Sequence, residues 1–211
     1  QYAESIAIGT SAGQGGQNDA SIAIGQNAGS GGQTGASIAI GQNAASGGQT
    51  GSAIAIGQNS ASGGQLDGSI AIGLYAGSGG QTGACVAIGA NAGSGGQTGA
   101  SIAIGENAGA GKQDVYSIAI GAGSASGGQT GSAIAIGADA GSGGQNIGAI
   151  AIGQGTGTNQ GIGSIAIGVG AGSINQPDSS IAIGSSTATN QGTQSVAVGE
   201  NAAMYSSSNQ S

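Results

Sequence analysis

The chain has 211 residues, of which 51 are glycine, and it contains no histidine, tryptophan or phenylalanine. Its one basic residue, Lys112, stands against eight acidic residues, so it cannot neutralise phosphates, and nucleic acid is excluded as a partner. No apolar run approaches the roughly 20 residues that cross a bilayer, so no membrane span is predicted.

After a short lead-in, residues 1–4, one tetrapeptide governs the sequence. Ile-Ala-Ile-Gly, or a close variant, recurs thirteen times, with successive repeats 16 residues apart at first and 15 or 16 apart near the end. Its first residue is Ile6, Ile22, Ile38, Ile54, Ile70, Val86, Ile102, Ile118, Ile134, Ile150, Ile165, Ile181 and Val196. Fixed periods of this kind are typical of stacked supersecondary units.

Each Ile-Ala-Ile triplet predicts a short β-strand, because it alternates with a period of two and is rich in β-branched residues. Several glycines in every repeat exclude helix. We therefore expect an all-β fold, a single-chain parallel β-solenoid of about 13 coils of 15–16 residues over residues 5–205. Residues 206–211 are expected to form a polar tail or linker.

The alternation gives each strand an isoleucine side and an alanine side. We expect the isoleucines to stack inside the solenoid as its structural core, represented by Ile22, Ile24, Ile38, Ile40, Ile54, Ile56, Ile102 and Ile104. The alanines would then form an outer face for self-association, represented by Ala23, Ala39, Ala55, Ala71, Ala87 and Ala103. Two isoleucines per coil offset little of the ordering cost, so we do not expect a lone monomer.

A glycine follows every triplet, and it predicts a corner with positive φ or crowded backbone. The corner glycines include Gly9, Gly25, Gly41, Gly57, Gly73, Gly89 and Gly105. A Gly-Gly pair, such as Gly31-Gly32, predicts a second corner in each coil. Asn27 and its equivalents near the first corner suit the left-handed conformations found in turns.

A glutamine falls once in every full repeat, while the position after it varies. We interpret this column as a buried amide ladder, with a ligand-binding stripe as the alternative. It comprises Gln17, Gln33, Gln49, Gln65, Gln81, Gln97, Gln113, Gln129, Gln145, Gln160, Gln176 and Gln191. Cys85, the one cysteine, is expected to be a small filler, with an interchain disulfide as the alternative.

The in-phase recurrence of Ser-Ile-Ala-Ile-Gly resembles the YadA-like head repeats of trimeric autotransporter adhesins, over roughly residues 5–203. It is also similar to repeats in fibre proteins of giant viruses and phages. The resemblance implies a left-handed parallel β-roll and three chains packed side by side. The repeat of the adhesin heads is nearer 14 residues, so the longer Gly-Ser-Gly-Gly-Gln-Thr-Gly corner here is a departure.

Catalytic and cofactor motifs are absent from the sequence. No glycine-rich loop ends in Gly-Lys-Ser/Thr, and the loops lack the aspartates of calcium-binding β-rolls, so we expect no cofactor and no metal. The serines have no histidine to activate them. Glu106 and Asp139, in related columns two repeats apart, are a remote candidate for a glycan-cleaving carboxylate pair.

We therefore expect a structural or adhesive fibre segment and not an enzyme, at an extracellular, cell-surface or virion-surface location. Its expected partner is itself, as a lateral homotrimer or as an end-to-end filament, with a host surface or a glycan as a further target. The alternative function is an ice-binding solenoid, whose best column would be Thr34, Thr50, Thr82, Thr98 and Thr130.

Overall fold

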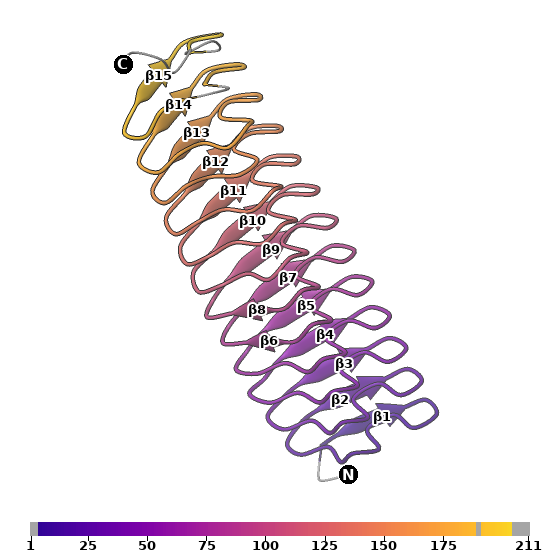
Figure 1. The fold of residues 1–211 in the computed structure, drawn as a ribbon. Helices are drawn as coiled ribbons and strands as arrows, with labels where there is room; N and C mark the ends of the chain where they lie inside the picture. The colour runs from indigo at the N-terminus through magenta and orange to yellow at the C-terminus, as the bar shows by residue number, and fades with distance from the viewer. Residues whose placement is uncertain (1–3, 189–190, 204–211) are drawn as a thin grey trace.

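The computed structural model describes residues 4–188 and 191–203, which form a rod of stacked coils with the strands Ile6–Ile8 and Val196–Val198 at its opposite ends (Figure 1). The described residues contain strands and turns but no helix. The strands are β1 (Ile6–Ile8), β2 (Ile22–Ile24), β3 (Ile38–Ile40), β4 (Ile54–Ile56), β5 (Ile70–Ile72), β6 (Gln81–Thr82), β7 (Val86–Ile88), β8 (Gln97–Thr98), β9 (Ile102–Ile104), β10 (Ile118–Ile120), β11 (Ile134–Ile136), β12 (Ile150–Ile152), β13 (Ile165–Ile167), β14 (Ile181–Ile183) and β15 (Val196–Val198).

The triplets form one parallel sheet of thirteen strands, in the order in which they occur in the chain. Each strand pairs with its equivalent in the next coil, so that Ile22 lies opposite Ile38 and Ala23 opposite Ala39. Backbone hydrogen bonds continue the ladder beyond the strands, as from the amide of Gly25 to the carbonyl of Ile8 at 2.7 Å. The all-β parallel solenoid with one coil per repeat is confirmed.

The glutamine column forms a second line of parallel pairing across the coil from the main sheet. Isolated bridges join Gln17 to Gln33 and its successors as far as Gln176, and β6 and β8 form a two-stranded sheet within the same line. Each coil therefore carries two points of backbone pairing, separated by the two corners.

The corners follow from backbone geometry that favours glycine. Gly25 has φ of 130°, and a Cβ built on it would lie 2.5 Å from the carbonyl oxygen of Gly41 in the next coil. All thirteen corner glycines have positive φ, so the first predicted corner is confirmed. At the second corner Gly32 has φ of 93°, while a Cβ on Gly31 would lie 2.6 Å from the backbone of the next coil.

The core of the rod is made of alanine. The central alanine of each triplet strand from β2 to β14 is fully buried (β6 and β8 have no alanine), and a second buried column follows the first corner, beginning at Ala28 and Ala44. Apart from Cys85, every buried hydrophobic residue among the described residues is alanine. Serine or threonine replaces alanine in the second column at Ser60, Ser124, Thr156 and Thr187, also fully buried.

The predicted isoleucine core is therefore wrong, and so is the predicted outward alanine face. Ile22, Ile24, Ile38, Ile40, Ile54, Ile56, Ile102 and Ile104 point outward and are half-buried or exposed, whereas Ala23, Ala39, Ala55, Ala71, Ala87 and Ala103 point inward and have no exposed surface. The reason is the width of the coil. The glutamine amides already fill the interior, where a Cβ added at Gly77 would lie 2.9 Å from the Gln81 amide and 3.2 Å from the Ala71 Cβ.

The predicted segment boundaries are only partly covered by the structure. Residues 1–3 of the lead-in, residues 204 and 205, and the whole predicted tail, 206–211, lie outside the described residues. Within them the regular strands run from Ile6 to Val198.

Candidate functional site

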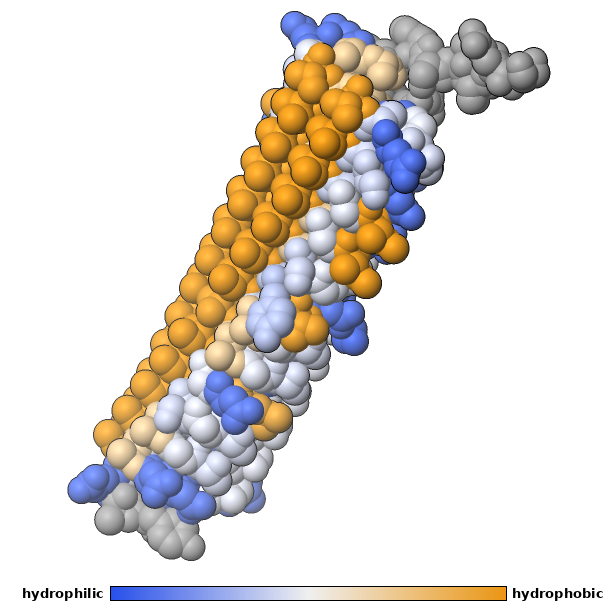
Figure 2. Space-filling view, turned by 90° about the vertical axis from the view of Figure 1, so that its left-hand side faces the viewer, coloured by the Kyte–Doolittle hydropathy of each residue, from blue (hydrophilic) through white to orange (hydrophobic). Residues whose placement is uncertain are grey.

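The outward side of the main sheet is a continuous apolar surface, which we call the isoleucine face. It consists of the first and third residues of strands β1–β5, β7 and β9–β15, all isoleucine or valine. Figure 2 shows these side chains as a straight double column along the length of the rod. In the interior of the sheet the third residue is up to 38 % exposed, as in Ile183.

The face carries no charge. None of its strands contains an acidic or basic residue, and exposed apolar residues elsewhere, such as Tyr116 and Ile147, lie in the turns. A contiguous apolar surface of this length is unusual on an isolated soluble chain, where the largest patch is about 300–600 Å². The signal for it in the sequence was the triplet itself, with its two sides assigned the wrong way round.

The glutamine column is an internal ladder of amides. The Nε2 of Gln17 donates to the Oε1 of Gln33 at 2.9 Å, and the Nε2 of Gln33 donates to the Oε1 of Gln49 at 2.8 Å. The same Nε2 also donates within its own coil, for example from Gln17 to the carbonyl of Ile6 at 3.2 Å. The side chains from Gln17 to Gln176 are at most 3 % exposed, so the predicted buried ladder is confirmed for them.

The ladder changes at the C-terminal end. Gln176 donates to the carbonyls of Ile165 and Ser180 instead of to the next amide. Gln191 is 8 % exposed and donates to the carbonyl of Ile181 at 2.9 Å, while its Oε1 has no partner within the part of the chain that the structure describes. The prediction of a fully paired column therefore fails at this last member.

Two further ladders line the first corner, and the sequence analysis did not predict them. Asn27 donates to Asn43 at 3.0 Å, and Asn43 donates to Asn59 at 3.0 Å, all with the left-handed φ expected of them. Next to them, the exposed Gln58 donates to Gln42 at 3.4 Å. Amide stacking from coil to coil thus occurs both inside and outside the rod.

Cys85 is fully buried and belongs to the interior. Its Sγ lies 3.4 Å from the carbonyl of Thr82, and burial raises the pKa of the thiol, an effect partly offset by hydrogen bonds to the backbone at Ser101, Ala100 and Thr82. The filler interpretation is confirmed, and a buried sulfur cannot reach a second chain while the coil is intact.

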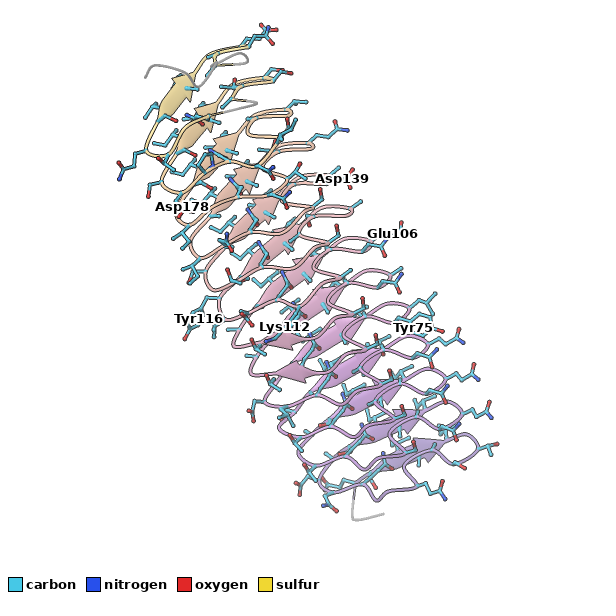
Figure 3. All side chains as sticks on the ribbon, viewed as in Figure 1. Tyr75, Glu106, Lys112, Tyr116, Asp139 and Asp178 are labelled. Atoms are coloured by element: carbon cyan, nitrogen blue, oxygen red, sulfur yellow. The ribbon has the colours of Figure 1, made fainter. Side chains whose placement is uncertain are left out.

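The carboxylates do not form a site. Glu106 and Asp139 are both exposed and lie along one edge of the rod with Tyr75, whereas Tyr116 and Asp178 lie along the other (Figure 3). Two coils separate Glu106 from Asp139, roughly 10 Å along the rod. Lys112 pairs with Asp114 at 3.0 Å in an exposed ion pair of small energetic value. No group of three residues suited to hold a metal occurs among the described residues.

The threonine column lies on the other side of the rod from the isoleucine face, beside a groove over the Gly-Gly corners. Three of its hydroxyls bond within the protein, among them those of Thr98, which donates to the carbonyl of Gln113 at 3.3 Å, and Thr130, which donates to that of Gln145 at 3.1 Å. The groove has a volume of about 620 Å³ between Gly15 and Lys112 and is lined mainly by glycine, glutamine and threonine.

Comparison with known proteins leaves the chain without an assigned relative. No family model matches the sequence, and neither the curated proteins nor the solved structures give a significant match. Within residues 4–188 and 191–203 no helix has the length and apolar character of a membrane span. The fold and the isoleucine face are therefore the basis for any statement about function.

Proposed function

We propose that the chain is a structural segment of an extracellular or virion-surface fibre, and that it assembles laterally through its isoleucine face. The observation that supports this proposal is the continuity of that face over thirteen strands without a charged residue. An apolar surface that runs the full length of a rod suits permanent contact along the rod. A site for a small ligand would instead be confined to one concave region.

The interior supports a mechanical role. Each coil is joined to the next by the sheet, by the second line of bridges and by buried amide pairs such as Gln33 to Gln49. Bonds of the same kind repeat along one axis, so every junction between successive coils carries an axial load through the same set of parallel bonds. In-register stacking of identical side chains, including amide ladders, is also what stabilises cross-β fibrils.

Catalysis and ice binding receive less support from the same residues. Glu106 and Asp139 are exposed and separated, and a general acid normally sits in a pocket that perturbs its pKa. The threonine column is interrupted by Leu66, Asp114 and Asn146, and hydroxyls such as that of Thr130 already bond to the next coil. We therefore propose a non-catalytic, structural role; adhesion to a host surface or a glycan remains a further proposal.

Electron microscopy of the purified chain tests the fibre proposal. Thirteen strands stacked at about 4.8 Å make a rod on the order of 60 Å long. We expect these rods to appear in ordered lateral or longitudinal assemblies that survive dilution. A preparation that contains only separate particles at every concentration would contradict a role in a fibre.

A further inference from the structure

The isoleucine face defines what can cover it, and the first constraint is its area. A third residue such as Ile104 is 37 % exposed, which corresponds to about 65 Å² of surface on an isoleucine. The first residue of each inner strand is half-buried and adds less, so over thirteen strands the two columns together offer on the order of 1,000 Å². A stable interface buries about 800 Å² on each partner, so this one surface is large enough for one.

The second constraint is its shape. The double column runs straight along the rod in Figure 2, without the twist that accumulates in most sheets. Flat sheets of many strands are unusual and are typically stabilised by stacking on another sheet or by side-chain ladders. The glutamine ladder accounts for the inner side of this sheet. Its outer side remains open to a partner that is equally flat and equally long.

The third constraint is chemical. Because no residue of the face is charged or polar, a partner gains nothing there from electrostatic complementarity, and the fit depends on apolar packing alone. Isoleucines repeat at the spacing of the coils, about 4.8 Å, with a gap between successive side chains in each column. A surface with the same repeat, offset by half a coil, would place its side chains in those gaps over the whole length.

The isoleucine face of a second copy of the chain meets all three constraints. We propose that two copies pair face to face through strands β1–β5, β7 and β9–β15 and form a dry, interdigitated interface. This inference rests on the proposed function and specifies the partner and the stoichiometry of its lateral assembly. The end-to-end arrangement does not cover the face and is compatible with such pairs.

The width of the face favours two chains over three. Sheets that face one another pack about 10 Å apart, so three sheets at half that distance from a common axis would each have to be about 17 Å wide, or about five residues. The strands here have three residues and end at Gly25 and its equivalents, where the chain turns away. Two such sheets cover one another completely, whereas three would leave the corners of their shared core open.

The test is the mass of the full chain in solution, measured by sedimentation at micromolar concentration. A pair has twice the 19.0 kDa of one chain. The disrupting variant carries Ile104→Lys and Ile136→Lys, two outward residues of the face. Its matched control carries Ala122→Lys and Ala138→Lys, which add the same charge at exposed turn positions beyond the first corner.

We expect the wild-type chain and the control to sediment as pairs, or as multiples of pairs, and the face variant to dissociate at least 100-fold more readily with an unchanged circular dichroism spectrum. If the face variant fails to fold, Ile104→Cys in a Cys85→Ala background provides the second measurement. A bismaleimide should join two copies through residue 104, and should not join them when the cysteine replaces Ala122.

Three results would overturn the inference: a folded wild-type monomer, a mass of three chains, or pairs that persist in the face variant without cross-linking at residue 104. Flotation of the wild-type chain with neutral lipid vesicles, together with a monomeric mass in their absence, would identify the face as lipid-binding and would also overturn it. Filaments of the face variant whose rods still lie side by side in pairs would leave the fibre function intact and reject only this interface. Pairs of the wild-type chain that never form filaments would support this interface and reject the fibre function.

Discussion

Replacement of Gln97 by alanine tests the internal ladder most directly. Gln97 is 1 % exposed; it accepts a hydrogen bond from the Nε2 of Gln81 at 2.6 Å and donates to the Oε1 of Gln113 at 2.7 Å. The substitution leaves both neighbouring amide groups buried without this partner. At about 1 to 3 kcal/mol for each stranded group, the free energy of unfolding should fall by about 2 to 6 kcal/mol.

Urea unfolding followed by circular dichroism measures this loss, with both proteins at one concentration because assembly itself contributes to stability. The matched control is Gln58→Ala, which removes an exposed amide that bonds to Gln42 at 3.4 Å and should cost less than about 0.5 kcal/mol. Hydrogen exchange should also accelerate in the coils that contain Gln81 and Gln113, and less in distant coils. Equal stabilities of the two variants would refute the argument that the buried ladder holds successive coils together.

Three further outcomes follow from single positions. Ser60→Ala should stabilise the rod or leave it unchanged, because the buried hydroxyl of Ser60 has no partner among the described residues. Ser124→Ala removes a 2.9 Å hydrogen bond to the backbone and should lower the stability by about 1 kcal/mol in thermal melts. The opposite order of the two stabilities would contradict this prediction. Gly41→Ala should lower the free energy of unfolding by more than about 3 kcal/mol, because Gly41 has φ of 130° and a Cβ there would lie 2.5 Å from a carbonyl of the next coil. Gly192→Ala should be tolerated, because a Cβ at Gly192 would have nothing within 4 Å. Equal losses of stability in the two variants would show that neither the contact nor φ matters. Cys85 should resist alkylation at pH 8 until the chain unfolds, because its thiol is fully buried. Burial raises the pKa of this thiol from its ordinary value of 9.0, so the wild-type chain should lose stability relative to Cys85→Ala as the pH rises above about 9. Parallel curves of stability against pH for the two proteins would argue against a buried thiol.

The repeat, the coil and the glutamine ladder could be predicted because each leaves a periodic trace in the sequence. Gln97 and its equivalents never vary while the next position does, and such constancy of a long polar side chain indicates a buried, hydrogen-bonded environment. The glycine after each triplet is equally constant because no side chain fits between Gly25 and Gly41. Periodicity therefore specified which residues are constrained and how far apart they stack.

Which side of each strand faces the interior could not be derived in the same way. Alternation shows that Ile24 and Ala23 point to opposite sides, but either side satisfies the pattern equally well. The choice depends on the width of the coil, which is set by the residues across from the strand. There the Gln33 amide and the Ala28 methyl already occupy the interior, so only a methyl group fits beneath the strand. A count of the volume available inside one coil would have placed the isoleucines outside.

The ladders at the first corner were missed for a related reason. Asn27 and Asn43 were assigned to turn conformation, and their φ values agree with that assignment. The stacking of their amides at 3.0 Å is a separate consequence of placing the same turn at the same height in every coil. Where the column is interrupted, as at Tyr75, the turn keeps its left-handed φ, so backbone conformation and the amide ladder are independent requirements.

The strict register of the main sheet makes the length of the molecule adjustable in whole coils. Ile22 lies opposite Ile38, and Ile38 lies opposite Ile54, with the same partners, corners and ladder at each level. Removal of residues 38–53 would join Ser37 to Ile54 and pair β2 with β4 in the same register. The rod would then be shorter by one coil, about 4.8 Å. Duplication of the same segment would lengthen the rod by one coil of equal height. A gene encoding such a chain can therefore lengthen or shorten its product by recombination between near-identical repeats, without having to solve a new folding problem at the junction.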